Sequence, residues 1–440
     1  MTATLRTLTL GCKVNQYETQ YVREGLERAG YVPAEDGQAA DLCIVNTCTV
    51  TNEGDAKSRQ AIRRLSRENP ASRIVVMGCY ATRAPEEVGE LPGVAEVVTD
   101  KRELPDLLGR FGVIDIPDGI SQFGDRHRAY VKVQDGCMLR CTYCIIPHVR
   151  PDLTSRPTQQ ILDEARRLVD NGYREIVLTG IHLGHYGVDW NWNKPKSEWV
   201  RLAHLVEQIA LLPGDFRIRL SSIEATEVTR ELIEVLKAHG DKICPHLHIC
   251  LQSGSDRILA RMNRRWSSKM FLSRCDLVRD QLDSPALTTD VIVGFPGETE
   301  EDFQASCEVS RRAGFSKIHI FPFSARRGTK AADFENQLPK SVKSDRCRQL
   351  SVIEAELRDS YFQSLVGRDL TVLGERVTAD GKMVGKSCRY ATVETSGNEH
   401  QVGELQTVRA NSVDDGLIVG ITEPMRSHTK ARRHEGKTSV

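Results

Sequence analysis

Short runs of β-branched and apolar residues alternate with helical patterns along the amino-terminal part of the chain. TLRTLTL, LCIVN and RIVVM are three such runs, and each leads through a loop into a segment with apolar residues at helical spacing. The helical segments are expected at 15–29, 52–67 and from about Pro85 onward. Strands that alternate with helices form parallel sheets covered by helices. We therefore predict an α/β fold that begins with a parallel-sheet domain over residues 1–115.

Each of these three predicted strands is followed by a loop cysteine: Cys12, Cys48 and Cys79. The carboxyl ends of parallel strands lie along one edge of the sheet, where ligands bind, so the three thiols are expected to converge. Three thiolates can hold an iron-sulfur cube and leave one iron free. The alternative is three unrelated, half-buried thiols. Cys43 lies inside its strand, so we interpret it as a small buried hydrophobe.

The central part of the chain alternates strands with helices over a longer distance. Segment 101–125 is rich in Gly and Pro and is expected to be a linker. After it, six apolar runs alternate with helical patterns: AYVKVQD, EIVLTG, FRIRLSS, HLHICLQ, ALTTDVIVG and KIHIFPF, with helices at 159–171, 198–212, 230–239, 269–280 and 300–313. This order predicts a partial (β/α)6 barrel over residues 123–356, with its chemistry at the carboxyl ends of the strands.

The carboxyl-terminal part changes texture after a charged helix expected at 341–365. The runs DLTVLGERV, MVGKSCRYATVET, LQTVRANSV and GLIVGIT are separated by glycines and predict a small β-barrel over residues 364–427. Small OB-like barrels bind RNA on an open face, and the alternative is a structural lid. Residues 428–440 form a basic tail with nothing to bury, which is either an additional phosphate contact or a solvated arm.

The loop after the first barrel strand carries the densest group of candidate ligands. In VQDGCMLRCTYCIIP, the cysteines Cys137, Cys141 and Cys144 follow a C-x3-C-x2-C spacing. Three thiolates on one loop can bind three irons of a 4Fe-4S cube and leave the fourth iron open for chemistry. A zinc site is the alternative, and it would need His148 as its fourth ligand. Tyr143 places an aromatic face beside the third cysteine.

Composition narrows the class of protein and its environment. The chain has thirteen cysteines and no secretory signal, which favours cluster chemistry in a reducing compartment over disulfides. No apolar run approaches the length of a membrane helix, so we expect a cytoplasmic protein without membrane contact. The 60 basic and 60 acidic side chains cancel, so any nucleic-acid surface must be a local patch.

The run from Cys244 to Cys250, CPHLHIC, imitates a metal site. Alternate residues of a strand share one face at about 6.6 Å spacing, so Cys244, His246, His248 and Cys250 would span roughly 20 Å. Four ligands so far apart cannot reach one ion. We interpret them as a polar stripe that faces the barrel interior or its cover.

Several phrases together resemble the radical S-adenosylmethionine (SAM) methylthiotransferases. They are LGCKVNQYE, NTCTVTNEGD, GCYA, DGC, YCIIP, EIVLTGIHLGHYG and LQSGS. The resemblance covers nearly the whole chain. It implies a methylthiotransferase amino-terminal domain, a radical SAM core and a terminal TRAM domain that binds RNA.

The resemblance also implies the cofactors and their ligands. Cys137, Cys141 and Cys144 would hold the 4Fe-4S cluster whose open iron chelates SAM, which the reduced cluster cleaves to a 5′-deoxyadenosyl radical. A second 4Fe-4S cluster would be held by the three amino-terminal loop cysteines: Cys12, Cys48 and Cys79. Residues at the strand ends would contact SAM, with a turn or packing role as the alternative for each: Tyr143, Thr179, Gly180, Ser222, Glu224, Gln252 and Gly294.

The implied substrate is the adenine 3′ to the anticodon, methylthiolated at carbon 2. The phrase TGIHLGHYG resembles family members that act on N6-threonylcarbamoyladenosine, whereas members that act on the isopentenylated base tend to carry TGQN. A protein-modifying relative, acting on a ribosomal aspartate, and a non-catalytic two-cluster protein are the alternatives. The expected partners are the tRNA anticodon stem-loop, a reductant such as flavodoxin or ferredoxin, and a sulfur donor. Segment 150–156 departs from the basic run usual after the third cysteine.

Overall fold

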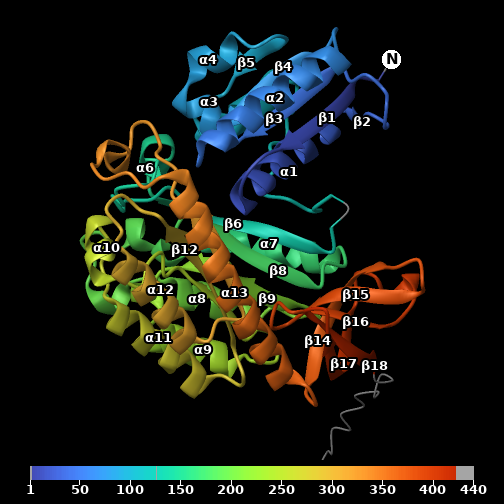
Figure 1. Cartoon of the computed structure of the whole chain (residues 1–440). Helices are drawn as coiled ribbons and strands as arrows, with labels where there is room; N and C mark the ends of the chain where they lie inside the picture. Colours follow the sequence, from blue (N-terminus) through green and yellow to red (C-terminus); the bar gives the residue numbers. More distant parts are fainter. Residues whose placement is uncertain (1, 125, 423–440) are drawn as a thin grey trace, which may run out of the picture.

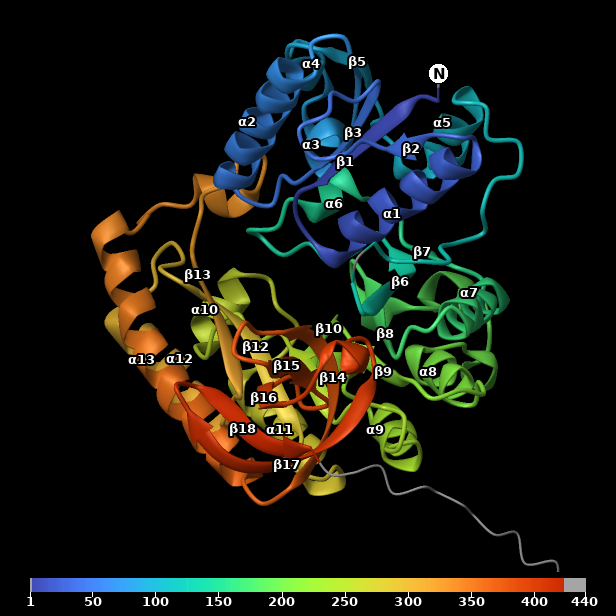
Figure 2. The same cartoon turned by 90° about the vertical axis from the view of Figure 1, so that its right-hand side faces the viewer.

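The computed structural model describes residues 2–124 and 126–422, and these residues form three packed units (Figure 1). A parallel sheet with its helices lies above a curled central domain, and a small barrel lies against the lower part of that domain (Figures 1 and 2). The predicted α/β class is confirmed. The predicted tail, 428–440, and the end of the predicted small-barrel domain, 423–427, lie outside the described residues.

The amino-terminal sheet has five parallel strands in the order β2-β1-β3-β4-β5. Helices cover both faces of this sheet. Alternate residues of the buried strand β3 pack into two separate apolar clusters, one on each face. The strands are β1 (Thr4–Thr9), β2 (Val32–Pro33), β3 (Leu42–Thr47), β4 (Arg73–Gly78) and β5 (Val94–Val97), and the long helices are α1 (Lys13–Arg28) and α2 (Asn52–Glu68).

One expectation for this part of the chain is confirmed and one was wrong. The helix expected from about Pro85 is α4 (Pro85–Gly89), but a short helix that was not anticipated, α3 (Cys79–Arg83), precedes it, because Gly78 turns the chain at a φ of +98°. Segment 101–125 is not all linker, since it contains η1 (Lys101–Glu103) and α5 (Leu104–Arg110). Helical spacing buries three leucines of α5 in the core beneath the sheet: Leu104, Leu107 and Leu108.

The central domain consists of two four-stranded sheets, β7-β6-β8-β9 and β10-β11-β12-β13, joined by a bridge between Ile218 and Ile243. The six predicted strands are confirmed as parallel neighbours around a partial barrel. They are β6 (Arg128–Asp135), β8 (Glu175–Gly180), β9 (Arg217–Leu220), β11 (His246–Ile249), β12 (Ala286–Val293) and β13 (Lys317–Pro322), and the short β7 (Thr154–Ser155) and β10 (Ser222–Ile223) were not anticipated.

The helices of the central domain cover the outside of the barrel (Figure 1). They are α7 (Thr158–Asp170), α8 (Leu202–Ala210), α9 (Arg230–Ala238), α11 (Ser268–Gln281) and α12 (Glu300–Ala313), with the short α6 (Ile146–Val149) and α10 (Asp256–Arg261) in loops. The helix expected at 198–212 starts at Leu202, because Trp199 and Arg201 take extended conformations before it.

The helix α13 (Lys340–Leu365) leads from the barrel into a closed five-stranded barrel of the order β14-β15-β16-β18-β17. The strands are β14 (Asp369–Val377), β15 (Lys382–Ser387), β16 (Thr392–Ser396), β17 (Leu405–Asp414) and β18 (Leu417–Thr422). The run MVGKSCRYATVET, expected as one strand, is two strands with a turn at Tyr390, whose φ is +63°.

The small barrel docks at the end of the central domain where the strands begin. Arg217 donates hydrogen bonds to the carbonyl oxygens of Thr371 and Lys386, and Arg219 donates to that of Ser387. Glu175 accepts from both arginines inside the barrel. The opposite end of the strands, where the ligand loops lie, therefore faces the amino-terminal sheet. Within the described residues, no helix is long and apolar enough to span a membrane.

Candidate functional site

The loop with three cysteines turns sharply after β6. Gly136 has a φ of +74°, and a Cβ there would lie 1.9 Å from the carbonyl oxygen of Asp152. Only glycine fits this approach. The amide of Cys137 donates to the carbonyl of Arg150 at 3.3 Å, so the loop folds back onto the segment that follows its third cysteine.

The three thiols of this loop lie together and are half-buried. The amide of Cys144 donates to the carbonyl of Cys141 at 3.1 Å. Burial, together with the charges of Cys141 and Cys137, raises the pKa of Cys144 to about 12. Thiols crowded in this way are easily ionised only beside a metal, which is the environment that a 4Fe-4S cluster supplies. His148, the fourth ligand of the zinc alternative, is exposed.

Arg264 supplies positive charge to this group, and the sequence did not single it out. Its Nη1 donates to the Sγ of Cys141 at 3.2 Å, and its Nη2 lies 3.0 Å from Oε2 of Glu224. The guanidinium stacks over Trp266 at 4.3 Å from the ring centroid. The side chain is 3% exposed, so its charge acts on the sulfur with little screening. It follows a helix far along the chain, and no local spacing links it to the cysteines.

A histidine pair lies on the other side of the thiols. Nδ1 of His182 is 3.5 Å from the Sγ of Cys137, and its Nε2 contacts Glu227. Burial opposes its charge, but Cys137 and Glu227 raise the pKa of His182 to about 10. His185 stacks on it at 3.6 Å, and burial together with the charge of His182 lowers the pKa of His185 to about 4. Both belong to TGIHLGHYG, which was noted as a phrase and not residue by residue.

The residues expected to contact SAM lie at strand ends around this group. Thr179 and Gln252 are buried, Ser222 is exposed, and Glu224 pairs with Arg264. Tyr143 makes an edge contact with Phe295 at 6.4 Å between ring centroids.

At Gly180 and Gly294, a larger side chain would clash with neighbouring atoms. A Cβ on Gly180 would lie 2.9 Å from Gln134, and one on Gly294, whose φ is +72°, would lie 2.4 Å from Lys343. Contact with SAM by any of these strand-end residues stays a prediction.

The three amino-terminal loop cysteines also come together, at the carboxyl edge of their sheet. Cys12 precedes α1, Cys48 follows β3, and Cys79 begins α3. Burial raises the pKa of Cys48, and Cys79 and Cys12 raise it further. A Cβ on Gly11 would lie 3.2 Å from the Sγ of Cys48, so the chain passes close to the thiol. An all-sulfur donor set of three on converging loops fits a second 4Fe-4S cluster.

Cys43 stays apart from this group. It is fully buried inside β3 and accepts a hydrogen bond from the hydroxyl of Ser72 at 3.3 Å. Burial raises its pKa, and the charges that act on it are those of Arg6 and Glu68, which lie away from the three loop thiols.

Arg150 joins the two cysteine groups. Its Nε donates to the Sγ of Cys79 at 3.4 Å, and its Nη1 donates to Glu18 at 2.7 Å and to Asp135 at 2.8 Å. Cys79 also packs against residues 145–149, which directly follow Cys144. The two groups are therefore separated by one short segment of chain. Its neighbours Pro151 and Asp152, part of the noted departure, line an adjacent cavity of about 550 Å³.

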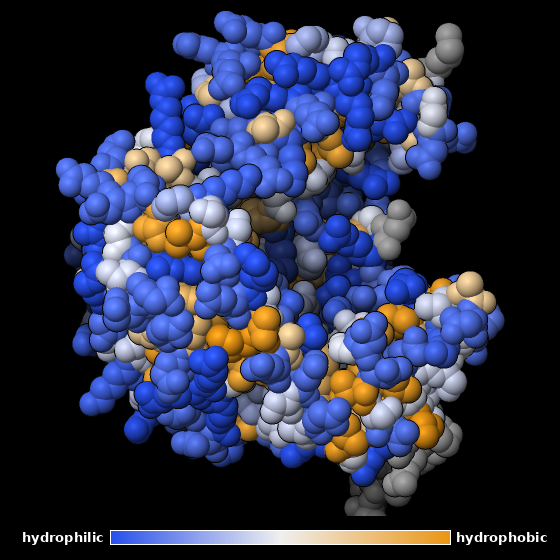
Figure 3. Space-filling model, in the orientation of Figure 1, coloured by the Kyte–Doolittle hydropathy of each residue, from blue (hydrophilic) through white to orange (hydrophobic). Residues whose placement is uncertain are grey.

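A second buried arginine holds the same two units together. Arg326, which follows β13, donates to Asn52 at 2.7 Å and to Asp55 at 2.5 Å, and it is 2% exposed. Between the amino-terminal unit and the small barrel the surface is hollowed, and its walls are mainly hydrophilic (Figure 3).

Two family descriptions match the chain. Residues 131–309 match the radical SAM superfamily, and residues 4–100 match the uncharacterized protein family UPF0004. Among solved structures, the radical SAM methyltransferase TsrM from Kitasatospora setae, with cobalamin and a 4Fe-4S cluster bound, is 14% identical. The match covers 73% of this chain and 75% of that chain at a TM-score of 0.52, which supports the fold alone.

Curated relatives match over most of their length. A threonylcarbamoyladenosine tRNA methylthiotransferase of Bacillus subtilis is 40% identical over 92% of this chain and 93% of its own. One of Thermotoga maritima is 38% identical over 94% and 96%. A tRNA-2-methylthio-N6-dimethylallyladenosine synthase of Corynebacterium glutamicum is 36% identical over 86% and 77%. With these identities over nearly its full length, the chain belongs to the radical SAM methylthiotransferase family.

Proposed function

We propose that this enzyme is a radical SAM tRNA methylthiotransferase that adds a methylthio group to carbon 2 of N6-threonylcarbamoyladenosine, 3′ to the anticodon. Four relatives that carry the threonylcarbamoyladenosine name are 34 to 41% identical and match more than 90% of this chain. The observation that carries the proposal is the pairing of two separate groups of three cysteines, one per unit, across Arg150. Methylthiolation needs both a radical source and a sulfur source at one substrate.

The residues that would hold the cofactors follow from this arrangement. Cys137, Cys141 and Cys144 would hold the 4Fe-4S cluster that binds SAM, and Cys12, Cys48 and Cys79 would hold the second cluster. When bound and reduced, the first cluster supplies the electron that cleaves SAM.

Charged side chains surround the site formed by Cys137, Cys141 and Cys144. Arg264 and protonated His182 lie beside the sulfurs of Cys141 and Cys137, so they stabilise thiolate charge there. Glu224 and Glu227 balance those cations and fix their orientation. The strand ends around them, with Tyr143, Thr179 and Gln252 as candidates, bind SAM and shield it from water.

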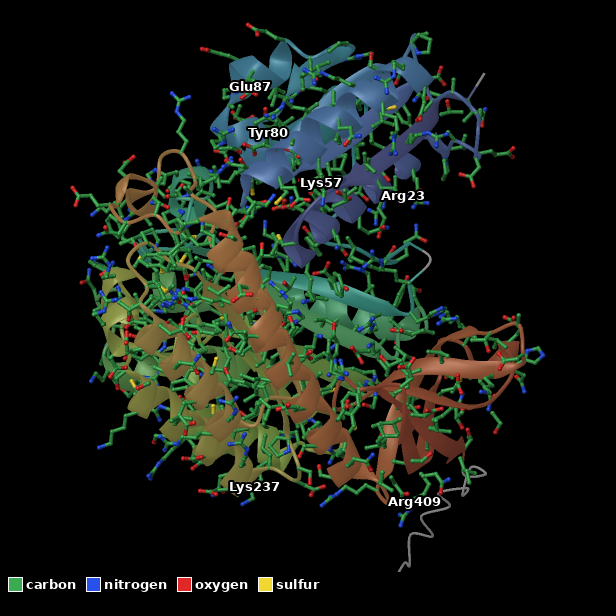
Figure 4. The ribbon with its side chains drawn as sticks, viewed as in Figure 1. Arg23, Lys57, Tyr80, Glu87, Lys237 and Arg409 are labelled. Atoms are coloured by element: carbon green, nitrogen blue, oxygen red, sulfur yellow. The ribbon has the colours of Figure 1, made fainter. Side chains whose placement is uncertain are left out.

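The remaining units are assigned to substrate and partners. We assign residues 1–115 to sulfur handling, 123–356 to radical chemistry and 364–427 to a TRAM domain that binds the anticodon stem-loop. Between residues 366 and 422 there are six basic and eight acidic side chains, so affinity cannot rest on net charge there. Arg409, at the outer end of the small barrel, is paired with Asp369 (Figure 4). A reductant such as flavodoxin or ferredoxin, a sulfur donor and a cytoplasmic location complete the proposal.

Nucleoside analysis tests this function directly. Loss of the gene should remove 2-methylthio-N6-threonylcarbamoyladenosine from total tRNA and leave the unmethylthiolated nucleoside in its place, as measured by mass spectrometry. The purified enzyme with both clusters should restore it on an anticodon stem-loop. Loss of the methylthiolated dimethylallyl nucleoside instead would assign the substrate of the Corynebacterium relatives. An unchanged tRNA profile, with loss of a modified ribosomal aspartate, would assign the protein substrate.

A further inference from the structure

Three neighbouring barrel strands carry polar side chains on the inner face. Alternate residues of β11, β12 and β13 pack outward in the apolar core under the helices: Leu247, Ile249, Leu287, Val291, Ile318 and Ile320. The residues between them face the interior: His246, His248, Thr288, Asp290 and His319. We refer to these five as the inner-face cluster. In register, His248 pairs with Thr288 and Asp290 pairs with His319, so the cluster is contiguous across three strands.

Contacts within the cluster leave some of its polar atoms without partners. The hydroxyl of Thr288 is 3.1 Å from Nε2 of His246 and 3.0 Å from Nδ1 of His248. Nε2 of His248 lies 3.3 Å from Oδ1 of Asp290 but makes no well-directed hydrogen bond, and Nδ1 of the 5%-exposed His246 has no partner among the described residues. Buried polar atoms are almost always satisfied, so unpaired ones inside a barrel mark a place for a water molecule or for the polar groups of a ligand.

The cluster is open to solvent on one side. β13 is the last strand of the partial barrel, and its inward residues His319 and Phe321 are exposed, whereas its outward Ile318 is buried. At the other end the ring of Tyr390, from the small barrel, stacks on His246 at 5.0 Å. The interior is therefore closed below by the small barrel and accessible from the edge at β13.

Positive charge enters this space from the amino-terminal unit. Burial disfavours a charged Asp290, but His248, His319 and Lys13 outweigh it and lower the pKa of that carboxyl. Burial would also raise the pKa of Tyr390, and Lys13 is foremost among the cations that lower it instead. Because the charge of Lys13 acts on both Asp290 of β12 and Tyr390 of the small barrel, its ammonium lies near both groups. Lys13 directly follows Cys12, so this interior adjoins the amino-terminal cysteine group.

We propose that the inner-face cluster, together with Lys13, is the subsite for the carboxylate-bearing N6 substituent of the substrate adenosine. The proposal rests on the proposed function and specifies how that substrate is recognised. Lys13 and the ring N–H of His319 bind the carboxylate. Asp290 accepts from a urea N–H or the hydroxyl, and His246 and His248 complete the polar wall.

The inner-face cluster with Lys13 offers both hydrogen-bond acceptors and positive charge, and the N6 substituent needs both. A threonylcarbamoyl substituent has N–H and O–H donors, a carbonyl oxygen and a carboxylate, so it needs acceptors and cations together. A dimethylallyl substituent has none of these and would leave every polar atom of the cluster desolvated and unpaired, which costs free energy. Phe321, one register step above His319, offers an aromatic face on which the base can stack.

Discrimination between an acid and its ester tests the subsite. Two anticodon stem-loops are compared, one with N6-threonylcarbamoyladenosine and one with its methyl ester, using enzyme with both clusters. The wild type should favour the acid in kcat/KM by about tenfold or more, as expected for a hydrogen bond to a charged group. His319→Ala should lower kcat/KM for the acid about tenfold and leave the ester nearly unchanged. Asp290→Asn should slow both substrates alike, since both retain the N–H and O–H groups.

A matched control and a binding measurement separate the outcomes. His204→Ala, on the outer helix α8, should keep the wild-type preference. RNA binding, followed by fluorescence anisotropy with SAM present, should show the same loss of preference in His319→Ala even if that variant turns over slowly. A wild type that treats acid and ester equally, or a His319→Ala variant that keeps the preference in binding, overturns the subsite alone.

Two further results would overturn the subsite by other routes. If the wild type methylthiolates no threonylcarbamoyl RNA, the proposed function fails and the subsite fails with it. His248, Asp290 and His319 also have ligand atoms within 4.8 Å of one another. A stoichiometric zinc or cobalt ion beyond the cluster iron, present in the wild type and lost in Asp290→Asn, would make the cluster a metal site instead.

Discussion

At the scale of single residues, Arg150 makes the contact between the two cysteine groups depend on one buried guanidinium. Arg150→Ala would leave the carboxylates of Glu18 and Asp135 buried with Lys132 as their main partner. Loss of one partner of a buried ion pair costs about 3 to 5 kcal/mol, so the melting temperature should fall by several degrees. Arg110→Ala, which removes the half-exposed pair with Glu96, should cost less than about 1 kcal/mol. Equal stability losses in the two variants would contradict this role.

The same contact has a defined pH dependence. Burial raises the pKa of Glu18, but Arg150 and Lys132 outweigh burial and lower it to about 2. A lowered pKa stabilises the folded state above the ordinary carboxyl value of about 4.3, and the stabilisation is lost as pH falls through about 2. The stability difference between wild type and Glu18→Gln should therefore be constant from pH 5 to 8 and shrink below about pH 4. Thermal melts across that range measure it, and a change between pH 6 and 8 would exclude this cause.

Cys43 and Cys48 are five positions apart and should behave differently. Cys43→Ala removes a packed thiol inside β3 and should cost about 1 kcal/mol while keeping full iron content. Cys48→Ala removes one of three converging thiols and should lose about four irons per chain. Iron analysis after anaerobic reconstitution distinguishes them. Loss of iron in Cys43→Ala, with retention in Cys48→Ala, would reverse the assignment.

At the scale of elements, the small barrel depends on charges buried in the central domain. Glu175 is fully buried, and Arg217 and Arg219, which it pairs with, bind backbone carbonyls of the small barrel. Glu175→Ala should destabilise the protein by about 3 to 5 kcal/mol and release the small barrel, because both arginines lose their counter-charge. Faster amide exchange in β15 and β16 would report the release. The surface variant Glu96→Ala should leave exchange there unchanged, and a protected β15 in Glu175→Ala would contradict the docking role.

Strands were predictable because alternation and apolar runs are local signals. The six barrel strands and helix α12 appear where the pattern placed them. The helix at Cys79 was missed, because its five residues are too short for periodicity to register. The turn at Tyr390 was also missed, since a tyrosine at a positive φ is not a local turn signal, and its ring instead packs on His246 of the central domain. Such tertiary contacts leave no trace in local spacing.

At the scale of the whole molecule, the two cysteine groups differ in how they could be found. The C-x3-C-x2-C spacing is local, whereas convergence of Cys12, Cys48 and Cys79 followed only from the parallel-sheet topology. Arg264, Arg326 and His319 could not be foreseen, because their partners are brought near only by folding of separate segments. Contacts between units thus escape analysis of the sequence, although they surround the site.

Each cysteine group lies in its own folding unit, so the two should be lost independently. Cys141→Ala should lose about four irons and stop formation of 5′-deoxyadenosine from SAM, because its loop is the one at the barrel rim. Cys79→Ala should also lose about four irons and stop methylthiolation, yet it should still form 5′-deoxyadenosine, since the barrel rim remains intact. Iron content and product formation, measured on the same preparations, give both readouts.

Arg150 contacts both cysteine groups, so loss of one cluster can affect the other through this residue. Its guanidinium touches Cys79 while its carbonyl holds the amide of Cys137, so the Cys79 variant can disturb the rim through this residue. Arg150→Lys keeps a cation there but loses the fork that spans Glu18 and Asp135, and it serves as the control. If Arg150→Lys keeps eight irons and 5′-deoxyadenosine formation, while Cys79→Ala keeps about four irons but forms no 5′-deoxyadenosine, the amino-terminal cluster would be required for the radical step itself, and the division of tasks between the two units would be wrong.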